Sequence, residues 1–461
     1  MDMDMDMRNG GTISVVMLPW LAHGHISPFL ELAKKLSRRN FYIYFCSTPV
    51  NLGCIKGKLN QENSRSIHLV ELHLPSSPDL PPHYHTTNGL PPHLMPTLKK
   101  AFDTANHSFA DILKSLKPDL LIYDILQPWA PTAASSLNIP AILFFSTGAA
   151  VLSIILHLGK RPGTEYPFPE IFHLLDFRRT TELNRVTGSG ANNMKDEERA
   201  AECLKLSSNV ILIKTFREME GKYIDYISAL SEKKLIPVGP LVADSTEEFE
   251  NAAIIDWLNK KDKLSAVLVS FGSEYFMSKE EMEEIAHGLE LSRVCFIWVV
   301  RILQGNKINN VEEALPEGYI RRVGERGMVV EGWAPQKKIL GHTSIGGFVS
   351  HCGWSSIMES IKFGVPIVAI PMQIDQPFNA KLLEAVGVGV EVKRNEDRRL
   401  EREEIARVIK EVVVEKSGEN VRRKVREMSE NMRKKADEEI AEVAEELVRL
   451  RKRDVAAASY S

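Results

Sequence analysis

The sequence predicts an α/β protein with two parallel-sheet domains, on three observations: its length, its composition and the order of its segments. With 461 residues the chain is too long for one comfortable hydrophobic core. Its composition, 44% hydrophobic and 26% charged, is that of a globular protein. Continuous runs of Val, Ile and Leu alternate with amphipathic stretches of 10–15 residues. That alternation is typical of parallel sheets covered by helices on both faces.

The first half of the chain shows this alternation from its beginning. We expect strands at 12–18, 41–48, 118–124 and 140–145, and helices at 28–39 and 128–138. The apolar stretch 141–159 is nearly long enough to span a bilayer. The Ser-Thr-Gly sequence at 146–148 interrupts it, so we expect a strand, a turn and a buried helix instead.

The second half repeats the pattern, and a Pro, Gly and acidic segment separates the halves. We expect strands at 266–273, 295–301, 327–333, 346–352 and 365–371, and helices at 278–292 and 355–363. The predicted limits are a first domain at 1–238 with a disordered start at 1–11, a linker at 239–252, a second domain at 253–440, and a terminal helix and tail at 441–461.

Charge, cysteines and missing motifs exclude several classes of protein. The net charge of −3 gives no reason to expect a nucleic-acid or membrane partner. Five scattered cysteines without a CxxC pair are typical of reduced thiols in a cytoplasmic protein, not of a disulfide framework or structural zinc. No predicted strand runs through GxGxxG into a helix, and GxxxxGK[ST] is absent, which argues against a nicotinamide oxidoreductase and a P-loop kinase. We expect a monomer.

The stretch HCGWSSIMES at 351–360 lies where a predicted strand turns into a predicted helix. Ligands bind at such carboxyl ends of parallel strands. A glycine at 353 lets the backbone approach a ligand, and the first amides of the helix favour an anion. His351, Ser355 and Ser356 can add donors, which predicts a phosphate site. The alternative is a structural turn, in which Ser356 and Glu359 form a capping box.

The residues around this stretch extend the motif. WAPQ begins at Trp333, HCGW lies at 351–354, and DQ ends at Gln376. This segment resembles the donor-binding signature of plant family-one UDP-dependent glycosyltransferases. The likeness continues in LPWLAHGHISPF at 18–29, LLIYD at 120–124 and VLVSFGSEYF at 267–276. The resemblance implies two facing Rossmann-like domains (the GT-B fold) with the active site in the cleft between them.

The resemblance also implies a role for each matched residue. Trp333 is expected to stack on uracil, and the backbone of Ala334 to pair with its edge. The ribose hydroxyls are expected on Gln336 and Glu359, and the sugar on Trp354, Asp375 and Gln376. The diphosphate is assigned to Ser273, Gly353 and the donors His351, Ser355 and Ser356. At Ser355 the family has asparagine, and the shorter serine can donate one hydrogen bond.

Two residues of the first half suggest an acid–base pair. His25 follows the first predicted strand and Asp124 follows another, so both lie at the carboxyl edge of one sheet. A histidine oriented by a carboxylate is the arrangement of a hydrolase triad without its serine. In the resembled family the histidine matching His25 is the general base, Asp124 matches its partner, and Thr147 matches a residue at the sugar. We predict no metal and no cofactor besides the donor, because helix amides and donors can take the diphosphate charge.

The resemblance predicts an inverting UDP-sugar glycosyltransferase (EC 2.4.1.-). Gln376 accompanies glucose donors in many relatives, so UDP-glucose is expected first, with UDP-xylose and UDP-glucuronate as alternatives. The first half resembles the branch that adds a sugar to the sugar of a flavonoid, terpenoid, lignan or apocarotenoid glycoside, through a 1→2 or a 1→6 bond. The alternatives are transfer to an aglycone hydroxyl or carboxyl and, in another class, a non-catalytic nucleotide-sugar-binding protein.

Overall fold

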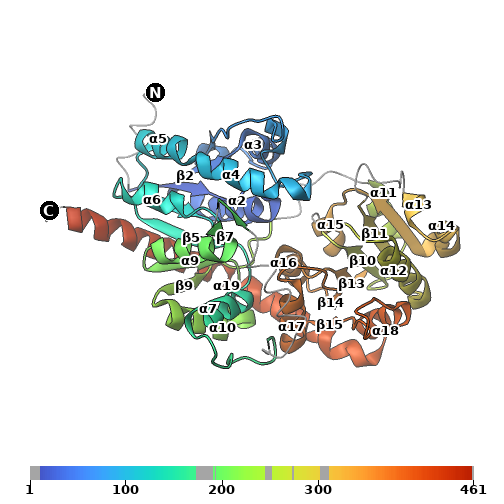
Figure 1. Cartoon of the computed structure of the whole chain (residues 1–461). Coiled ribbons are helices and arrows are strands. Elements are labelled where there is room, and N and C mark those ends of the chain that lie inside the picture. Colours follow the sequence, from blue (N-terminus) through green and yellow to red (C-terminus); the bar gives the residue numbers. More distant parts are fainter. Residues whose placement is uncertain are drawn as a thin grey trace. The chain divides into compact units, whose positions relative to one another are not determined.

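The computed structural model describes residues 11–172, 190–192, 194–243, 252–272, 275–301 and 311–458. Their contacts group them into two compact units (Figure 1). The first contains the described residues of 1–164, 183–241 and 435–461, and the second those of 165–182 and 242–434. The units therefore interleave along the chain, whereas the predicted limits at 238, 252 and 440 are continuous. The predicted disordered start, except Gly11, and residues 244–251 of the predicted linker lie outside the described residues.

Within the described part of the first unit, seven parallel strands form one sheet in the order β3-β2-β1-β4-β5-β8-β9. The strands are β1 (Ile13–Leu18), β2 (Phe41–Ser47), β3 (Ile67–Glu71), β4 (Leu120–Tyr123), β5 (Ala141–Phe145), β8 (Val210–Ile213) and β9 (Lys234–Pro237). The helices are α2 (His23–Ser37), α3 (Pro49–Lys56), α4 (Met95–Thr104), α5 (Asn106–Leu116), α6 (Trp129–Ser135), α7 (Ala149–Lys160), α9 (Asp196–Leu206) and α10 (Arg217–Ser231). A short antiparallel pair, β6 (Gly190–Ala191) and β7 (Met194–Lys195), lies apart from this sheet. The predicted strand, turn and helix of 141–159 are confirmed by β5 and α7.

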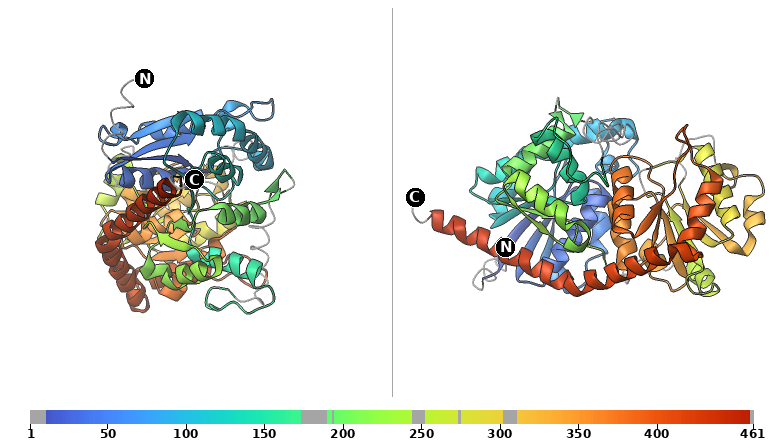
Figure 2. Two further views of the ribbon diagram at one scale, coloured as in Figure 1. Left: turned by 90° about the vertical axis from the view of Figure 1, so that its left-hand side faces the viewer. Right: turned by 90° about the horizontal axis from the view of Figure 1, so that it is seen from below.

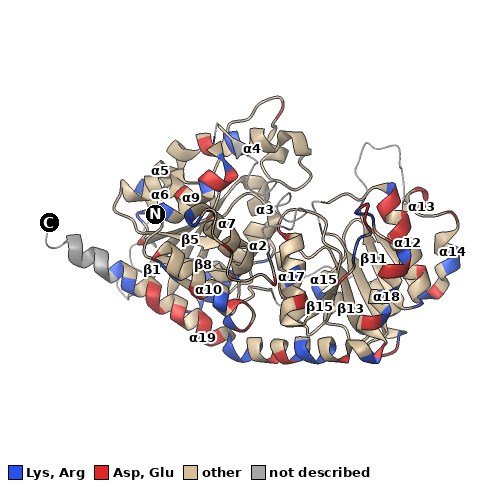
Figure 3. Cartoon of the chain, turned by 60° about the horizontal axis from the view of Figure 1, so that its bottom comes forward, with Lys and Arg blue, Asp and Glu red and all other residues tan. Residues whose placement is uncertain are grey.

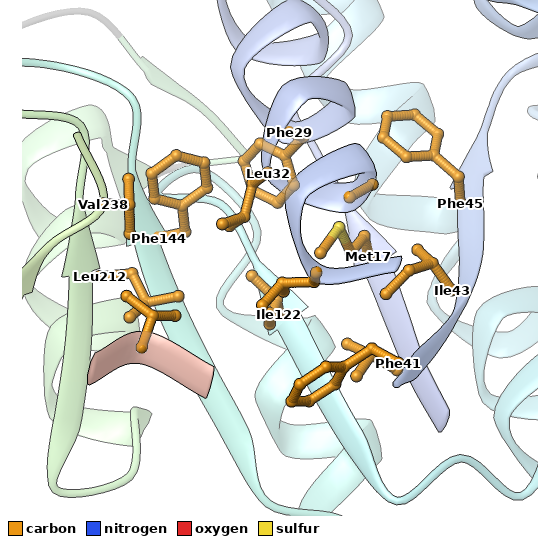
Figure 4. Close-up of a cluster of buried hydrophobic side chains, with 14 of the residues drawn as sticks. Met17, Phe29, Leu32, Phe41, Ile43, Phe45, Ile122, Phe144, Leu212 and Val238 are labelled. Atoms are coloured by element: carbon orange, nitrogen blue, oxygen red, sulfur yellow. The ribbon is translucent and has the colours of Figure 1, made fainter. Parts of the chain in front are cut away.

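The core of the first unit forms where apolar side chains of α2 meet one face of the sheet. Figure 4 shows Phe29 and Leu32 of α2 against Met17, Ile122 and Phe144, whose strands lie side by side. Val16 and Leu18, which alternate with Met17 along β1, are also fully buried. Because successive strand residues point to opposite faces, both faces of the sheet are covered.

The described residues of the second unit form a sheet of six parallel strands in the order β12-β11-β10-β13-β14-β15. These are β10 (Ala266–Ser270), β11 (Cys295–Val300), β12 (Gly327–Glu331), β13 (Ile345–Ser350), β14 (Ile367–Ala369) and β15 (Gly389–Glu391). The helices are α11 (Ala252–Asn259), α12 (Lys279–Ser292), α13 (Val311–Ala314), α14 (Tyr319–Val323), α15 (Gln336–Leu340), α16 (Trp354–Lys362), α17 (Gln376–Val386) and α18 (Arg402–Val413). Val267 and Val269 belong to one apolar cluster and Ala266 and Leu268 to another, so this sheet too is covered on both faces.

The last helix, α19 (Glu419–Ala458), is a single long helix, which Figure 2 shows from below. Its residues up to 434 group with the second unit and those from 435 on with the first. Ile440, Val443 and Leu447 are fully buried in the core of the first unit. Its mixed charges (Figure 3) form pairs one turn apart, such as Arg423–Glu427 at 2.7 Å. Among the residues described, no helix is long and apolar enough to cross a membrane.

Candidate active site

Each sheet has one point where the strand order reverses. In the first unit it lies between β1 and β4, where Leu18 is paired with Tyr123. In the second it lies between β10 and β13, where Ser270 is paired with Ser350. In open α/β sheets the crevice beyond the strands' carboxyl ends at such a point is where ligands bind. The residues that follow these four strands are therefore the first place to look for a site in each unit.

In the first unit, the predicted pair of His25 and Asp124 meets at this point. His25 lies in the first turn of α2, after the loop 19–22 that follows β1, and Asp124 directly follows β4. The Nδ1 atom of His25 is 2.8 Å from Oδ2 of Asp124. The carboxylate is completely buried, whereas 28% of the histidine side chain is exposed. A buried acceptor thus holds the Nδ1 atom of an imidazole that solvent can still reach.

Backbone amides orient the Asp124 carboxylate. The amide of Trp20 donates to Oδ2 at 3.0 Å and that of Ile125 donates to Oδ1 at 2.7 Å. These bonds orient the carboxylate so that Oδ2 accepts a hydrogen bond from the Nδ1–H group of the imidazole. The proton-bearing Nδ1 leaves Nε2 of His25 with a lone pair. The arrangement can therefore act as a general base.

Sequence reasoning missed a third residue at this pair. The hydroxyl of Ser146 lies 3.0 Å from Nδ1 of His25, and Ser146 is 9% exposed. Its neighbour Thr147, which the sequence did single out, is half-buried in the same loop between β5 and α7. The position of Ser146, next to a matched residue in FFST, is the only hint that the sequence offers.

In the second unit, the turn after β13 holds His351 tightly. The imidazole lies between the backbones of Gly272 and Gly353, because a Cβ atom on either would come within 2.6 Å of its Nε2. Both glycines are therefore needed to make room for the ring, and sequence reasoning missed Gly272. Burial lowers the pKa of His351 to about 4, so the ring is neutral at pH 7 and can donate one N–H.

The helix after this turn has an open amino end. Helix α16 begins at Trp354, with Gly353 as its N-cap and no side-chain hydrogen bond to cap it. Ser356 is thus the third residue inside the helix, and the capping box that the sequence offered as an alternative is wrong. The S-x-x-E spacing instead places Ser356 and Glu359 on one face, where Nε2 of Gln336 lies 3.3 Å from Oγ of Ser356 and 2.7 Å from Oε2 of Glu359.

The other predicted donor residues that the structure describes here follow β12 or begin α16. Trp333 follows β12 and is 53% exposed, as a stacking platform must be. Ala334 and Trp354 are buried at 7% and 5% exposure. Ser355, the second residue of α16, is half-buried. Ser273, which follows β10, lies outside the described residues.

Asp375 and Gln376 lie at the start of α17, where side chains hold the preceding loop. The Gln376 carbonyl oxygen accepts from the amides of Met372 and Gln373 at 3.0 and 2.9 Å. Its NH₂ group is therefore the part of the amide left for a ligand. Oδ2 of Asp375 accepts from Asn379 at 2.9 Å, and Asn379 also donates to the carbonyl of Cys352. These bonds connect the loop before α17 with the turn that carries His351.

No group of three or more His, Cys, Asp and Glu residues within the described ranges could hold a metal ion. The five cysteines are all free thiols.

Family comparisons cover nearly the whole chain. The family model described as "UDP-glucoronosyl and UDP-glucosyl transferase" matches residues 245–430, and the one described as "Glycosyltransferase, N-terminal domain" matches residues 11–243. Mogroside IIIx synthase of Siraitia grosvenorii is 59% identical over 95% of this chain and 98% of its own. The β-D-glucosyl crocetin β-1,6-glucosyltransferase of Gardenia jasminoides is 51% identical over 94% and 98%. The cyanidin-3-O-glucoside 2-O-glucuronosyltransferase of Bellis perennis is 47% identical over 98% and 99%.

Solved structures show the same fold. The Glycyrrhiza uralensis protein UGT73P12, complexed with glycyrrhetinic acid 3-O-monoglucuronide, has a TM-score of 0.84 at 24% identity and covers 97% of this chain and 98% of its own. A transferase from Siraitia grosvenorii in complex with UDP has a TM-score of 0.73 at 26% identity and covers 95% of this chain and 100% of its own. Both matches extend over the two parallel-sheet units.

Proposed function

The chain belongs to the UDP-dependent glycosyltransferase family and has its GT-B fold, and we propose that it transfers glucose from UDP-glucose to a sugar hydroxyl of a plant glycoside. The product is a β-linked sugar chain. The observation that carries the proposal is the His25–Asp124 pair, with Nδ1 and Oδ2 2.8 Å apart and the histidine side chain 28% exposed. A protein that only binds nucleotide sugars has no need of a base.

In this proposal the second unit holds the donor. Trp333 stacks on uracil, the backbone of Ala334 pairs with the base, and Gln336 and Glu359 take the ribose hydroxyls. The uncapped amides of α16, with His351, Gly353, Ser355, Ser356 and Ser273, take the diphosphate. Trp354, Asp375 and Gln376 contact the glucose.

The first unit supplies the proton acceptor. Nε2 of His25 removes the proton from the acceptor hydroxyl as its oxygen attacks the anomeric carbon, and UDP leaves from the opposite face. The reaction inverts the configuration, so an α-linked donor gives a β-glycoside. Asp124 stabilises the imidazolium that forms, as the carboxylate of a hydrolase triad does. Thr147, beside the pair in the same unit, contacts the transferred sugar.

The names of the relatives support a glycoside acceptor. The Gardenia relative is named for a glucosyl crocetin and the Bellis relative for a cyanidin glucoside, so both names give a glycoside as the acceptor. Their names also differ in linkage and donor, so 1→6 and 1→2 bonds and a glucuronosyl donor remain the alternatives to be distinguished. Transfer to a bare aglycone is the second candidate.

Paired acceptors test this function. UDP release from UDP-glucose is followed with terpenoid, flavonoid and apocarotenoid glucosides and with each matching aglycone. We expect UDP release with the glucosides. NMR of the product should show that the new glycosidic bond is formed by a hydroxyl group of the acceptor's sugar. Faster turnover with the aglycones would replace the proposed acceptor, and UDP-glucose binding without release under any condition would favour the binding protein.

We further propose that the enzyme is a cytoplasmic monomer that needs no metal. The five free cysteines and the net charge of −3 support the location. The open amino end of α16 supports metal-free binding of the diphosphate. Turnover that is unchanged after exhaustive treatment with EDTA is expected, and activity restored only by added Mg²⁺ or Mn²⁺ would contradict it.

A further inference from the structure

We infer that Ser146 is a positioning residue for His25 and that Glu220 holds Ser146 in place. The inference rests on the proposed function, because it matters only if His25 removes the acceptor proton. Ser146 and Glu220 both lie outside the motif at 333–376 that resembles the family's donor-binding signature.

Two oxygen atoms share the Nδ1 proton of His25. Its Nδ1 lies 2.8 Å from Oδ2 of Asp124 and 3.0 Å from Oγ of Ser146. With Asp124 ionised, the proton sits on Nδ1 and points between the two oxygens, so Ser146 accepts the second branch of a bifurcated bond. The opposite arrangement, with the hydroxyl donating to a bare Nδ1, would leave the carboxylate facing a lone pair at 2.8 Å. Two acceptors therefore restrict the plane of the ring more than one would.

Ser146 lies in a short loop. It has three residues, 146–148, between the end of β5 and the start of α7. Strand β5 is paired with β4 on one side and with β8 on the other, which fixes the first end of the loop. In a connection this short, the two ends together decide where the Ser146 hydroxyl lies.

The carboxylate of Glu220 fixes the second end of this loop, where α7 begins. The amides of Ala149 and Ala150, in the first turn of α7, donate to Oε2 and Oε1 of Glu220 at 2.8 and 2.7 Å. Glu220 is fully buried, and it lies in α10 at a residue with non-helical backbone angles (φ −128°, ψ 17°). A helix start needs partners for its first amides, and here a carboxylate from another helix supplies them in a two-pronged contact. Glu220 thus clamps α7 and, through the three-residue loop, sets Ser146 beside His25.

A matched pair of variants tests the role of the hydroxyl. Ser146→Thr keeps the hydroxyl, and Ser146→Val has the same shape without it. We expect Ser146→Val to have a kcat about 2- to 10-fold below that of Ser146→Thr, as the loss of one ordinary hydrogen bond gives. The KM for UDP-glucose stays equal in the two variants.

The pH profile separates positioning from packing. Without the second acceptor the imidazolium is less stable, so the acid limb of kcat/KM moves to lower pH in Ser146→Val and stays at the wild-type position in Ser146→Thr. Packing alone would change the two variants equally. Equal kcat values and superimposable acid limbs would overturn the inference.

The connection to Glu220 is tested by a double-mutant cycle. Glu220→Gln keeps the size of the side chain and removes one of the two acceptors for the α7 amides. We expect it to lower kcat in the wild-type background and to have little further effect in Ser146→Val, because both changes act through one hydroxyl. If Glu220→Gln lowers kcat by the same factor in the wild type and in Ser146→Val, then Glu220 does not act through Ser146. Melting curves of all variants identify loss of fold.

One more variant keeps this inference apart from the proposed function. If His25→Ala abolishes transfer while the Ser146 pair behaves alike, the proposed base stands and only the positioning role fails. If His25→Ala still transfers glucose, the proposed function of the pair itself fails.

Discussion

Gly353 illustrates how a single residue can serve a site by leaving space for a neighbouring side chain. The sequence suggested that a glycine there lets the backbone approach a phosphate, and in the structure its missing side chain is what leaves room for the His351 ring. Its φ of −62° is open to any residue, so the requirement is for space and not for an unusual backbone conformation. At Gly272 both requirements apply, because a Cβ there would lie 2.6 Å from Nε2 of His351 and the φ of +77° favours glycine.

Gly353→Ala is therefore expected to weaken donor binding. The added Cβ would lie 2.5 Å from Nε2 of His351, so the ring must move out of place. We expect at least a tenfold rise in the Kd for UDP, measured by calorimetry, with the fold retained. Gly159→Ala is the matched control, because its Cβ would meet no atom within 4 Å. Equal affinity in the two variants would show that the ring is not held for the donor.

His351 also predicts how acid affects the fold. Burial lowers its pKa from 6.5 to about 4, so between these values the unfolded chain binds a proton that the folded chain does not. This residue should therefore reduce the free energy of unfolding as the pH falls from about 6.5 to about 4. Denaturant titrations of the wild type and of His351→Gln, each at pH 7 and at pH 4.5, measure this change in the free energy of unfolding. The wild type should lose more stability on acidification than the variant, and equal losses would contradict the buried neutral ring.

At the scale of elements, α19 is the helix whose role the sequence describes least well. Its dense charges predict a solvated terminal helix, and its exposed face agrees with that (Figure 3). The opposite face carries Ile440, Val443 and Leu447, which are fully buried in the core of the first unit. The charges outnumber these apolar residues, so the composition of the segment hides its packing face.

Leu447→Ala should destabilise the first unit by about 2–5 kcal/mol, the usual effect of a large-to-small change in a core. Urea unfolding followed by intrinsic fluorescence measures the loss. The control is Glu445→Ala, two residues away on the exposed face of the helix. A Leu447 variant as stable as this control would mean that α19 does not contribute to the core.

At the scale of the whole molecule, the sequence predicts what depends on local patterns. Alternating apolar runs and helices give both sheets, and the carboxyl ends of strands give the positions of His25, Asp124 and His351. These inferences need only the order of elements and the rule that ligands bind where the strand order reverses.

Contacts between distant segments could not be predicted in the same way. Ser146 is 121 residues from His25 in sequence, and only its place next to Thr147 distinguishes it from any other serine in a loop. Gly272 and Gly353 come together only because β10 pairs with β13. The spacing of Ser356 and Glu359 fits a capping box and the interior of a helix equally well, and only the observed start of α16 decides between them.

The central claim is that one unit binds the donor and the base of the other removes the acceptor proton. The most direct test measures both properties in His25→Ala: the Kd for UDP by calorimetry and kcat with UDP-glucose and a glucoside acceptor. We expect an unchanged Kd and a kcat reduced by about 10²–10⁴-fold, the range typical of a lost general base. Near-normal turnover, or a loss of UDP binding as large as the loss of rate, would contradict the account.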